Sequence, residues 1–305
     1  MLTWNVEGLT SKLRHSDFIK FIQDFDIICL TETWLQSTEE NIFTLTGFDC
    51  FLGPGIKHEG KNRGRMAGGV LLGWKAEEFE IIKLKKNTNF TRWIGIIKNG
   101  SVVLCIGVVY IQPSDSVYFK DEFFEMLTEE IGEIDEKYYG AGKILMGDLN
   151  ARIGEEDCTG GRGDDWLPNR KSKDKSINSS GRKLLQLMES TGMIIANGRV
   201  KGDESGEYTF LNSNGGSVVD VILTDRGIFS NIDKVEVKER LESQHLPVSV
   251  DIFIPDFQKN SFSNVVKSEY KRIRWSEKKI DVDIFKKGIS DKGADLILTD
   301  RGIFF

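Results

Sequence analysis

Long apolar runs are absent from this sequence. None of its hydrophobic stretches approaches the roughly 18–20 residues that a membrane-spanning helix requires, so we expect no membrane partner. No basic segment followed by an apolar one precedes the first predicted strand, so we expect no secretory leader. Cysteine is scarce: the chain has four, without CxxC spacing, which disfavours a disulfide framework or a zinc site. These absences predict an intracellular protein with reduced thiols.

A positive net charge is also lacking. The 305 residues carry a formal net charge of −6, which argues against a polybasic protein whose affinity for nucleic acid comes from many phosphate contacts. A nuclease stays compatible with this value, because it can be acidic overall and basic only along its groove. Hydrophobic residues (39%) and aromatic residues (10%) are numerous enough to form the core of one large domain.

The spacing of apolar residues predicts about a dozen strands and few helices. A strand at 2–6, a helix at 16–25 and a strand at 26–30 make a unit of βαβ size, so we expect two parallel neighbouring strands. Asn99-Gly100 predicts a tight hairpin. So many strands exceed one small sheet, so we expect an α/β fold in which two packed sheets carry helices on their outer faces.

The composition changes near Pro255, after which lysine is frequent. The segment 220–229, DVILTDRGIF, recurs as DLILTDRGIF at 295–304. One isolated copy is too short for a solenoid repeat, so we expect only the first copy in the core sheet. We therefore predict a domain at 1–255 and a poorly ordered tail at 256–305.

Polar side chains follow several predicted strands. They are Asn5, Glu32, Tyr110, Asp148 with Asn150, Asp220 and His245. In a two-sheet sandwich such strand ends can meet at one rim. Carboxylate and amide oxygens suit a hard divalent cation, and a histidine oriented by a carboxylate can bind a phosphate or move a proton. Taken singly, each residue is more often a solvated strand end or a turn residue; together they favour phosphodiester hydrolysis.

Several motifs in order resemble the endonuclease/exonuclease/phosphatase superfamily, which includes DNase I and exonuclease III. They are LTWNVEGL, CLTETWL, AGGVLLGWK, VVYIQP, GDLNAR, SVVDVILT and SQHLPV, and they cover residues 1 to about 255. NRKSKDKSINSSGRKLL and the tail EYKRIRWSEKK are similar to the apurinic-like endonuclease domain of non-LTR (LINE-type) retrotransposons. The resemblance implies a DNase I-like four-layer sandwich of two mixed β-sheets packed face to face. It also implies a nuclear enzyme that nicks DNA, within a larger protein whose reverse transcriptase is missing from this chain.

The resemblance also assigns roles to residues of the motifs. Glu32 would be the main Mg²⁺ ligand, with Mn²⁺ as a substitute, and Asn5 a second ligand. Tyr110 would contact the scissile phosphate and His245, held by Asp220, would bond it. Asp148 would orient or deprotonate the attacking water, and Asn150 would position that water or the phosphate.

Gln244 departs from the family pattern, which has an aspartate directly before the histidine. An amide can still offer an oxygen at the metal position, but it removes one negative charge and cannot accept a proton at neutral pH. The alternatives to a DNA endonuclease are therefore a catalytically impaired DNA-binding remnant and a small-molecule phosphatase of the same fold.

Two basic segments are candidates for contact with the DNA backbone. The first is a loop with Lys57, Lys61, Arg63 and Arg65. The second holds Arg162, Arg170, Lys171, Lys173 and Lys175, interleaved with aspartates. For this second segment a solvated loop is as good an interpretation as a DNA-facing one.

Overall fold

The computed structural model describes residues 1–37, 43–57, 66–85, 89–157, 166–254, 297–299 and 302–304. The chain forms two compact units, Met1–Ser261 and Phe262–Phe305. Among the described residues no helix is both long and apolar enough to span a membrane.

The first sheet of the larger unit contains the two strands nearest the N-terminus. Its strands, in spatial order, are β13 (Ile232–Val237), β14 (Val248–Ile252), β1 (Leu2–Asn5), β2 (Ile27–Thr31), β4 (Val70–Trp74) and β3 (Asp49–Gly53). β1 and β2 run parallel and are joined through α1 (Leu9–Lys12) and α2 (Ser16–Gln23), which confirms the predicted βαβ unit. All other pairs in this sheet are antiparallel.

The second sheet has the same number of strands. They are β5 (Glu80–Lys85), β6 (Thr91–Lys98), β7 (Ser101–Tyr110), β8 (Gly142–Asp148), β12 (Asp220–Thr224) and β9 (Ile194–Ile195), in this order. β7 and β8 are parallel and are joined through α3 (Phe123–Lys137), while α4 (Ser179–Thr191) lies before β9. Asn99 and Gly100 have φ of 52° and 76° and pair Lys98 with Ser101, so the predicted hairpin is confirmed.

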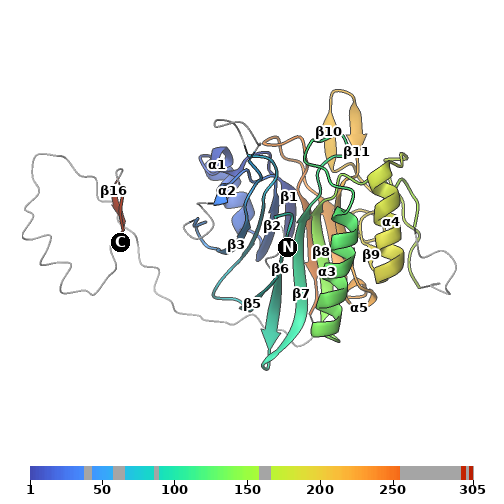
Figure 1. Cartoon of the computed structure of the whole chain (residues 1–305), viewed down its shortest axis with the longest axis horizontal. Coiled ribbons are helices and arrows are strands. Elements are labelled where there is room, and N and C mark those ends of the chain that lie inside the picture. The colour runs from blue at the N-terminus through green and yellow to red at the C-terminus, as the bar shows by residue number, and fades with distance from the viewer. Residues whose placement is uncertain are drawn as a thin grey trace, which may run out of the picture. The chain divides into compact units, whose positions relative to one another are not determined.

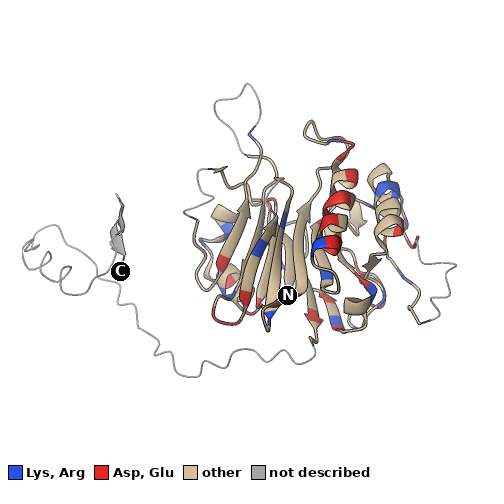
Figure 2. Ribbon diagram, turned by 60° about the horizontal axis from the view of Figure 1, so that its bottom comes forward, with Lys and Arg blue, Asp and Glu red and all other residues tan. Residues whose placement is uncertain are grey.

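Three apolar clusters hold four layers together. The central cluster fills the space between the sheets, and two outer clusters join each sheet to its own helices. Side chains of a strand alternate between the two faces of its sheet, so one strand contributes to two clusters. In β8, Ile144 and Met146 face the other sheet, whereas Leu145 faces α3 and α4. Figure 1 shows α1 and α2 on one outer side and α3 and α4 on the other. Acidic residues gather on α3 (Figure 2). The expected α/β sandwich of two mixed sheets is therefore confirmed.

The repeated segment adopts two different structures. Its first copy forms β12 in the second sheet and then α5 (Arg226–Phe229), which Asp225 caps by accepting a hydrogen bond from the Ile228 N–H (2.8 Å). In the second copy, β15 (Ile297–Thr299) pairs with β16 (Gly302–Phe304) as a separate two-stranded sheet. Local sequence alone therefore does not determine this structure. Residues 255–296 lie outside the described ranges, so the boundary at 255 and the poor order of the tail stay predictions.

Candidate active site

The ends of β1, β2, β7, β8 and β12 meet at one rim of the sandwich, and the Asn5 side chain helps to link the two sheets there. Its Nδ2 donates hydrogen bonds to Glu32 Oε1 (3.1 Å) and to Asp148 Oδ2 (2.9 Å). Its Oδ1 accepts from the Glu7 N–H (3.1 Å). In this arrangement Asn5 offers its nitrogen, not its oxygen, to the carboxylates, so it orients them.

Glu32 follows β2 and is held from several sides. Its Oε1 also accepts from the Tyr110 hydroxyl (2.8 Å), and its Oε2 accepts from Trp34 Nε1 (3.2 Å). The Glu32 backbone has φ of 49°, a left-handed conformation that non-glycine residues rarely adopt. Such strain persists only where the surroundings impose it, and it is common at functional sites. The carboxylate is thus fixed in direction before any ligand arrives.

Asp148 lies at the end of β8 and is fully buried. The Asn150 N–H donates to its Oδ1 (2.9 Å), and Asn150, with φ of 48°, also donates through Nδ2 to the Ile111 carbonyl (2.9 Å). Gly147 is required in front of this turn, because a Cβ there would lie 1.8 Å from the Val109 carbonyl oxygen. Burial and the neighbouring charge of Asp220 raise the pKa of Asp148 to about 7.

His245 and Asp220 form a buried pair beside Asp148. His245 Nδ1 lies 2.8 Å from Asp220 Oδ2, and His245 Nε2 lies 3.8 Å from Asp148 Oδ2. Burial acts to lower the pKa of His245, but the charges of Asp220 and Asp148 outweigh it and raise the pKa to about 10. The main chain is fixed as well, since Trp4 Nε1 donates to the His245 carbonyl (2.8 Å). Ligand atoms of the three residues lie within 4.8 Å of one another.

Gln244 is exposed, and its backbone is hydrogen-bonded to Glu7. Its N–H donates to Glu7 Oε2 (2.8 Å), which also accepts from the Ser243 hydroxyl (2.9 Å). Within the described residues the Gln244 side chain makes no hydrogen bond to Asn5 or Glu32. The sequence interpretation left Glu7 without a role, although it stands two positions after Asn5 in the same motif. Glu7 is thus a further carboxylate at the rim, and it holds the loop that carries Gln244.

A pocket of about 430 Å³ opens beside the cluster. It is lined by Asn150, His245 and Phe210, and also by Arg152 and Asn178. Phe210 belongs to a small hairpin, β10 (Phe210–Asn212) and β11 (Gly215–Ser217), and its ring centroid lies 4.8 Å from that of His245. The cluster is therefore reachable from solvent although several of its members are buried.

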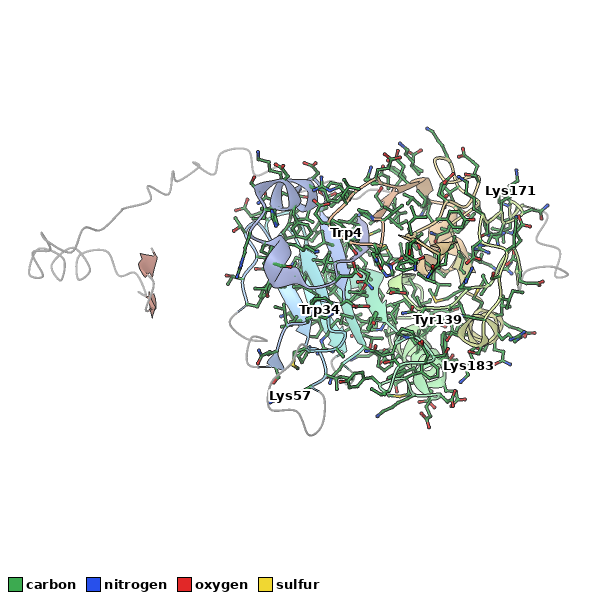
Figure 3. All side chains as sticks on the ribbon, turned by 90° about the horizontal axis from the view of Figure 1, so that it is seen from above. Trp4, Trp34, Lys57, Tyr139, Lys171 and Lys183 are labelled. Atoms are coloured by element: carbon green, nitrogen blue, oxygen red, sulfur yellow. The ribbon has the colours of Figure 1, made fainter. Side chains whose placement is uncertain are left out.

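The structure describes only part of the predicted DNA-contacting set. Arg170 is 6% exposed and donates to the Gly154 carbonyl, so its interpretation as a DNA contact is wrong. Lys173 and Lys175 pair with Glu207 and Glu155, which favours the solvated-loop interpretation for them. Lys57 is exposed, and it lies on the opposite side of the molecule from Lys171 in the view of Figure 3. Of the remaining candidates, Lys61, Arg63, Arg65 and Arg162 lie outside the described residues.

Asn178 fixes the turn that carries Asn150. As the N-cap of α4 it accepts from the Gly181 N–H (2.7 Å), and the same Oδ1 accepts from the Arg152 N–H (3.0 Å). Its Nδ2 donates to the Asn150 carbonyl (2.9 Å). One amide therefore satisfies the helix start and also holds a turn whose backbone is in an unfavourable conformation.

Asn178→Ala should lower stability by about 1 kcal/mol, a usual cost of losing an N-cap, and should also lower hydrolysis at this site. Asn178→Asp keeps the two acceptor bonds but sets a carboxylate oxygen against the Asn150 carbonyl in place of the donor, so it should lose less stability than Asn178→Ala and still lose activity. Thermal unfolding and a hydrolysis assay on both variants separate the two effects. Full activity in Asn178→Asp would show that Asn178 acts only as a helix cap.

Similarity to known proteins identifies the family of this chain. The chain belongs to the Endonuclease/Exonuclease/phosphatase family, whose sequence model matches residues 2–237. An exodeoxyribonuclease of Bacillus subtilis (strain 168) is 24% identical over an alignment of 269 residues, which covers 84% of this chain and 95% of the relative.

Solved structures share the fold at lower sequence identity. The AP endonuclease LMAP of Leishmania major is 17% identical with a TM-score of 0.63, over 83% of this chain and 87% of that one. The endonuclease domain of TRAS1, a telomere-specific non-LTR retrotransposon, is 18% identical with a TM-score of 0.52, over 82% and 96%.

Proposed function

We propose that this chain is a metal-dependent phosphodiester hydrolase that nicks target DNA for a non-LTR retrotransposon. The observation that carries the proposal is the single hydrogen-bonded cluster in which Asn5 joins Glu32 to Asp148, and Asp148 lies beside the Asp220–His245 pair. The names of the similar proteins support DNA as the substrate, and one of them is a retrotransposon endonuclease domain. Membership in a larger retrotransposon protein and a nuclear location are part of the same proposal.

The residues at the rim fit a hard divalent cation. Glu32 and Asp148 point toward a common amide group, and burial together with Asp220 disfavours the charged form of Asp148. An added positive charge would relieve this excess of carboxylates. Glu32 would be the main holder of Mg²⁺, or of Mn²⁺ as a substitute, and Asn5 and Gln244 stay predicted ligands. When bound, the cation would neutralise charge on the phosphate and stabilise the leaving oxygen.

The chain's own side chains supply the remaining chemistry. Asp148 orients the attacking water and accepts its proton, and Asn150 keeps that carboxylate and the water in place. His245 presents Nε2 to the phosphate, because its Nδ1 is engaged by Asp220. The Tyr110 hydroxyl, next to Glu32, is placed to contact the same phosphate. Hydrogen bonds from the backbone and from neighbouring side chains hold these groups in place. Little reorganisation of the site is therefore required during the reaction.

Nicking of supercoiled plasmid, with Mg²⁺ and with EDTA, tests this proposal. We expect open-circular product with Mg²⁺ and none with EDTA. Release of phosphate from nucleotides or inositol phosphates without nicking would favour the small-molecule phosphatase. DNA binding that is insensitive to metal, without turnover, would identify a catalytically impaired remnant.

Gln244→Asp should raise nicking about tenfold at low Mg²⁺ concentration, a size typical of changes in groups around a metal. The reason is that aspartate would add a negative charge near Asn5, since the Gln244 N–H donates to Glu7 and the Glu7 N–H donates to Asn5 Oδ1. A Mg²⁺ titration of the nicking rate measures the effect. Gln244→Asn is the matched control, because it shortens the side chain equally without adding charge. Equal rates for all three chains would mean that this position has no part in metal binding.

A further inference from the structure

A second pocket shares Tyr110 with the catalytic cluster. Its volume is about 180 Å³, and its lining includes Gln112, Gly69 and Tyr110, whose hydroxyl donates to Glu32. Sites for drug-sized ligands measure about 300–1,000 Å³, so this one suits a single planar ring. The proposed function gives this pocket no role.

The walls of this pocket are aromatic and apolar. Phe90 and Phe123 are buried, and their ring centroids lie 4.8 Å apart with a tilt of 52°. Met126 stands at the edge and is 36% exposed. Gly69, with φ of 90°, brings bare backbone to the lining, so no side chain obstructs that side. Flat apolar walls of this kind stack favourably with nucleobases, whatever their sequence.

The polar groups of the pocket are suited to a nucleotide. Gln112 is 7% exposed, and its Oε1 lies 3.2 Å from the Tyr110 hydroxyl. Its Nε2 has no hydrogen-bond partner among the described residues, so a donor is available to an acceptor that enters the pocket. Lys120 is exposed and belongs to the lining, and Lys57 follows Ile56, another lining residue. An aromatic slot with one amide donor and cations at its edge matches a base that carries its phosphate.

We propose that this pocket binds one unpaired pyrimidine of the DNA strand that lies across the catalytic cluster. The inference rests on the proposed function and adds a substrate preference to it. A base inside a duplex cannot enter, whereas an unpaired base leaves the stack at low cost. Its ring would pack against the Phe90–Phe123 pair, and a carbonyl oxygen at its edge would accept a hydrogen bond from Gln112 Nε2. Lys120 would face the adjoining phosphate.

The test compares two DNA duplexes that differ by one unpaired thymine. Binding is measured by fluorescence anisotropy in EDTA, so that no DNA is cut. The wild-type chain should bind the duplex with the unpaired thymine at least tenfold more tightly than the fully paired one. Met126→Trp fills the pocket and should remove this preference, and Ala67→Leu fills it from another part of the lining in case the first variant folds poorly. Glu136→Trp is the matched control, because it adds the same ring to the exposed end of α3, about 15 Å from Met126 along the helix.

The outcomes distinguish this inference from the proposed function. Equal binding of the two duplexes by the wild-type chain, or a preference that survives in both filled variants, would overturn the pocket assignment alone. A wild-type chain that binds neither duplex and nicks no plasmid would overturn the proposed function and the pocket assignment with it. A preference that is lost in the filled variants and kept in Glu136→Trp supports the inference.

Discussion

His245→Ala should reduce the nicking rate by about 10²–10⁴-fold, the range that a positioned acid–base group contributes. The imidazole is buried and fixed at Nδ1 by Asp220, so Nε2 faces the reacting phosphate in a set direction. Alanine removes this donor and leaves the Asp220 carboxylate buried without its partner. The measurement is the initial rate of plasmid nicking at saturating Mg²⁺, with thermal unfolding recorded for the same samples.

His15→Ala is the control for this experiment. His15 is exposed at the start of α2, and its side chain makes no capping hydrogen bond there. The control should therefore keep the wild-type rate. Asp220→Asn adds a second check, because it keeps the shape of the Asp220–His245 pair but weakens the hydrogen bond to the imidazole. The nicking rate of this variant should fall between those of the wild type and His245→Ala. If His245→Ala nicks DNA within about threefold of the wild-type rate, the assigned role of this histidine is wrong.

Glu32→Ala should abolish Mg²⁺-dependent nicking and weaken metal binding. Three donors, from Asn5, Tyr110 and Trp34, hold this carboxylate toward the cluster, so no neighbouring side chain can replace it by a simple rotation. We expect a loss of about 10³-fold or more, because charge stabilisation at the phosphate is commonly the largest contribution to such reactions. Mn²⁺ binding, followed by electron paramagnetic resonance, measures the metal site directly and without turnover.

Two further variants separate charge from shape at this position. Glu32→Gln keeps the size of the side chain but removes the negative charge, and it should be nearly as inactive as Glu32→Ala. Glu80→Ala, at the exposed start of β5, removes a carboxylate that lies outside the cluster and should leave both readouts unchanged. Undiminished Mn²⁺ binding in Glu32→Ala would place the cation elsewhere and would falsify the proposed role of Glu32.

The main features of the fold follow from local patterns in the sequence. The helix between two apolar strands predicts the parallel pair β1 and β2, and Asn99-Gly100 predicts the tight hairpin. These predictions hold because side-chain periodicity and turn chemistry act over a few residues. The meeting of polar strand ends was predictable too, since it requires only that the strands of two sheets end at one rim.

Other features of the site depend on contacts between distant segments. The charge pattern around Arg170 is compatible with a DNA-facing loop, yet its guanidinium is buried against Gly154. The direction of the Asn5 amide depends on Glu7 and on two carboxylates from other strands. The periodicity of apolar residues cannot predict the burial of Arg170 or the orientation of the Asn5 amide. Both depend on residues that are remote in sequence.

The sequence by itself determined the fold class, which is two sheets with helices outside. It also determined which functional groups stand at the strand ends, namely carboxylates, amides and one histidine. Only the tertiary structure decided which of these groups touch, as shown by Asn5 donating to both Glu32 and Asp148 and by Glu7 holding the loop with Gln244. The repeated segment gives the physical reason, since its first copy forms β12 and α5, whereas in its second copy β15 pairs with β16. Side-chain contacts supplied by the surrounding fold outweigh the weak local preference of a short segment.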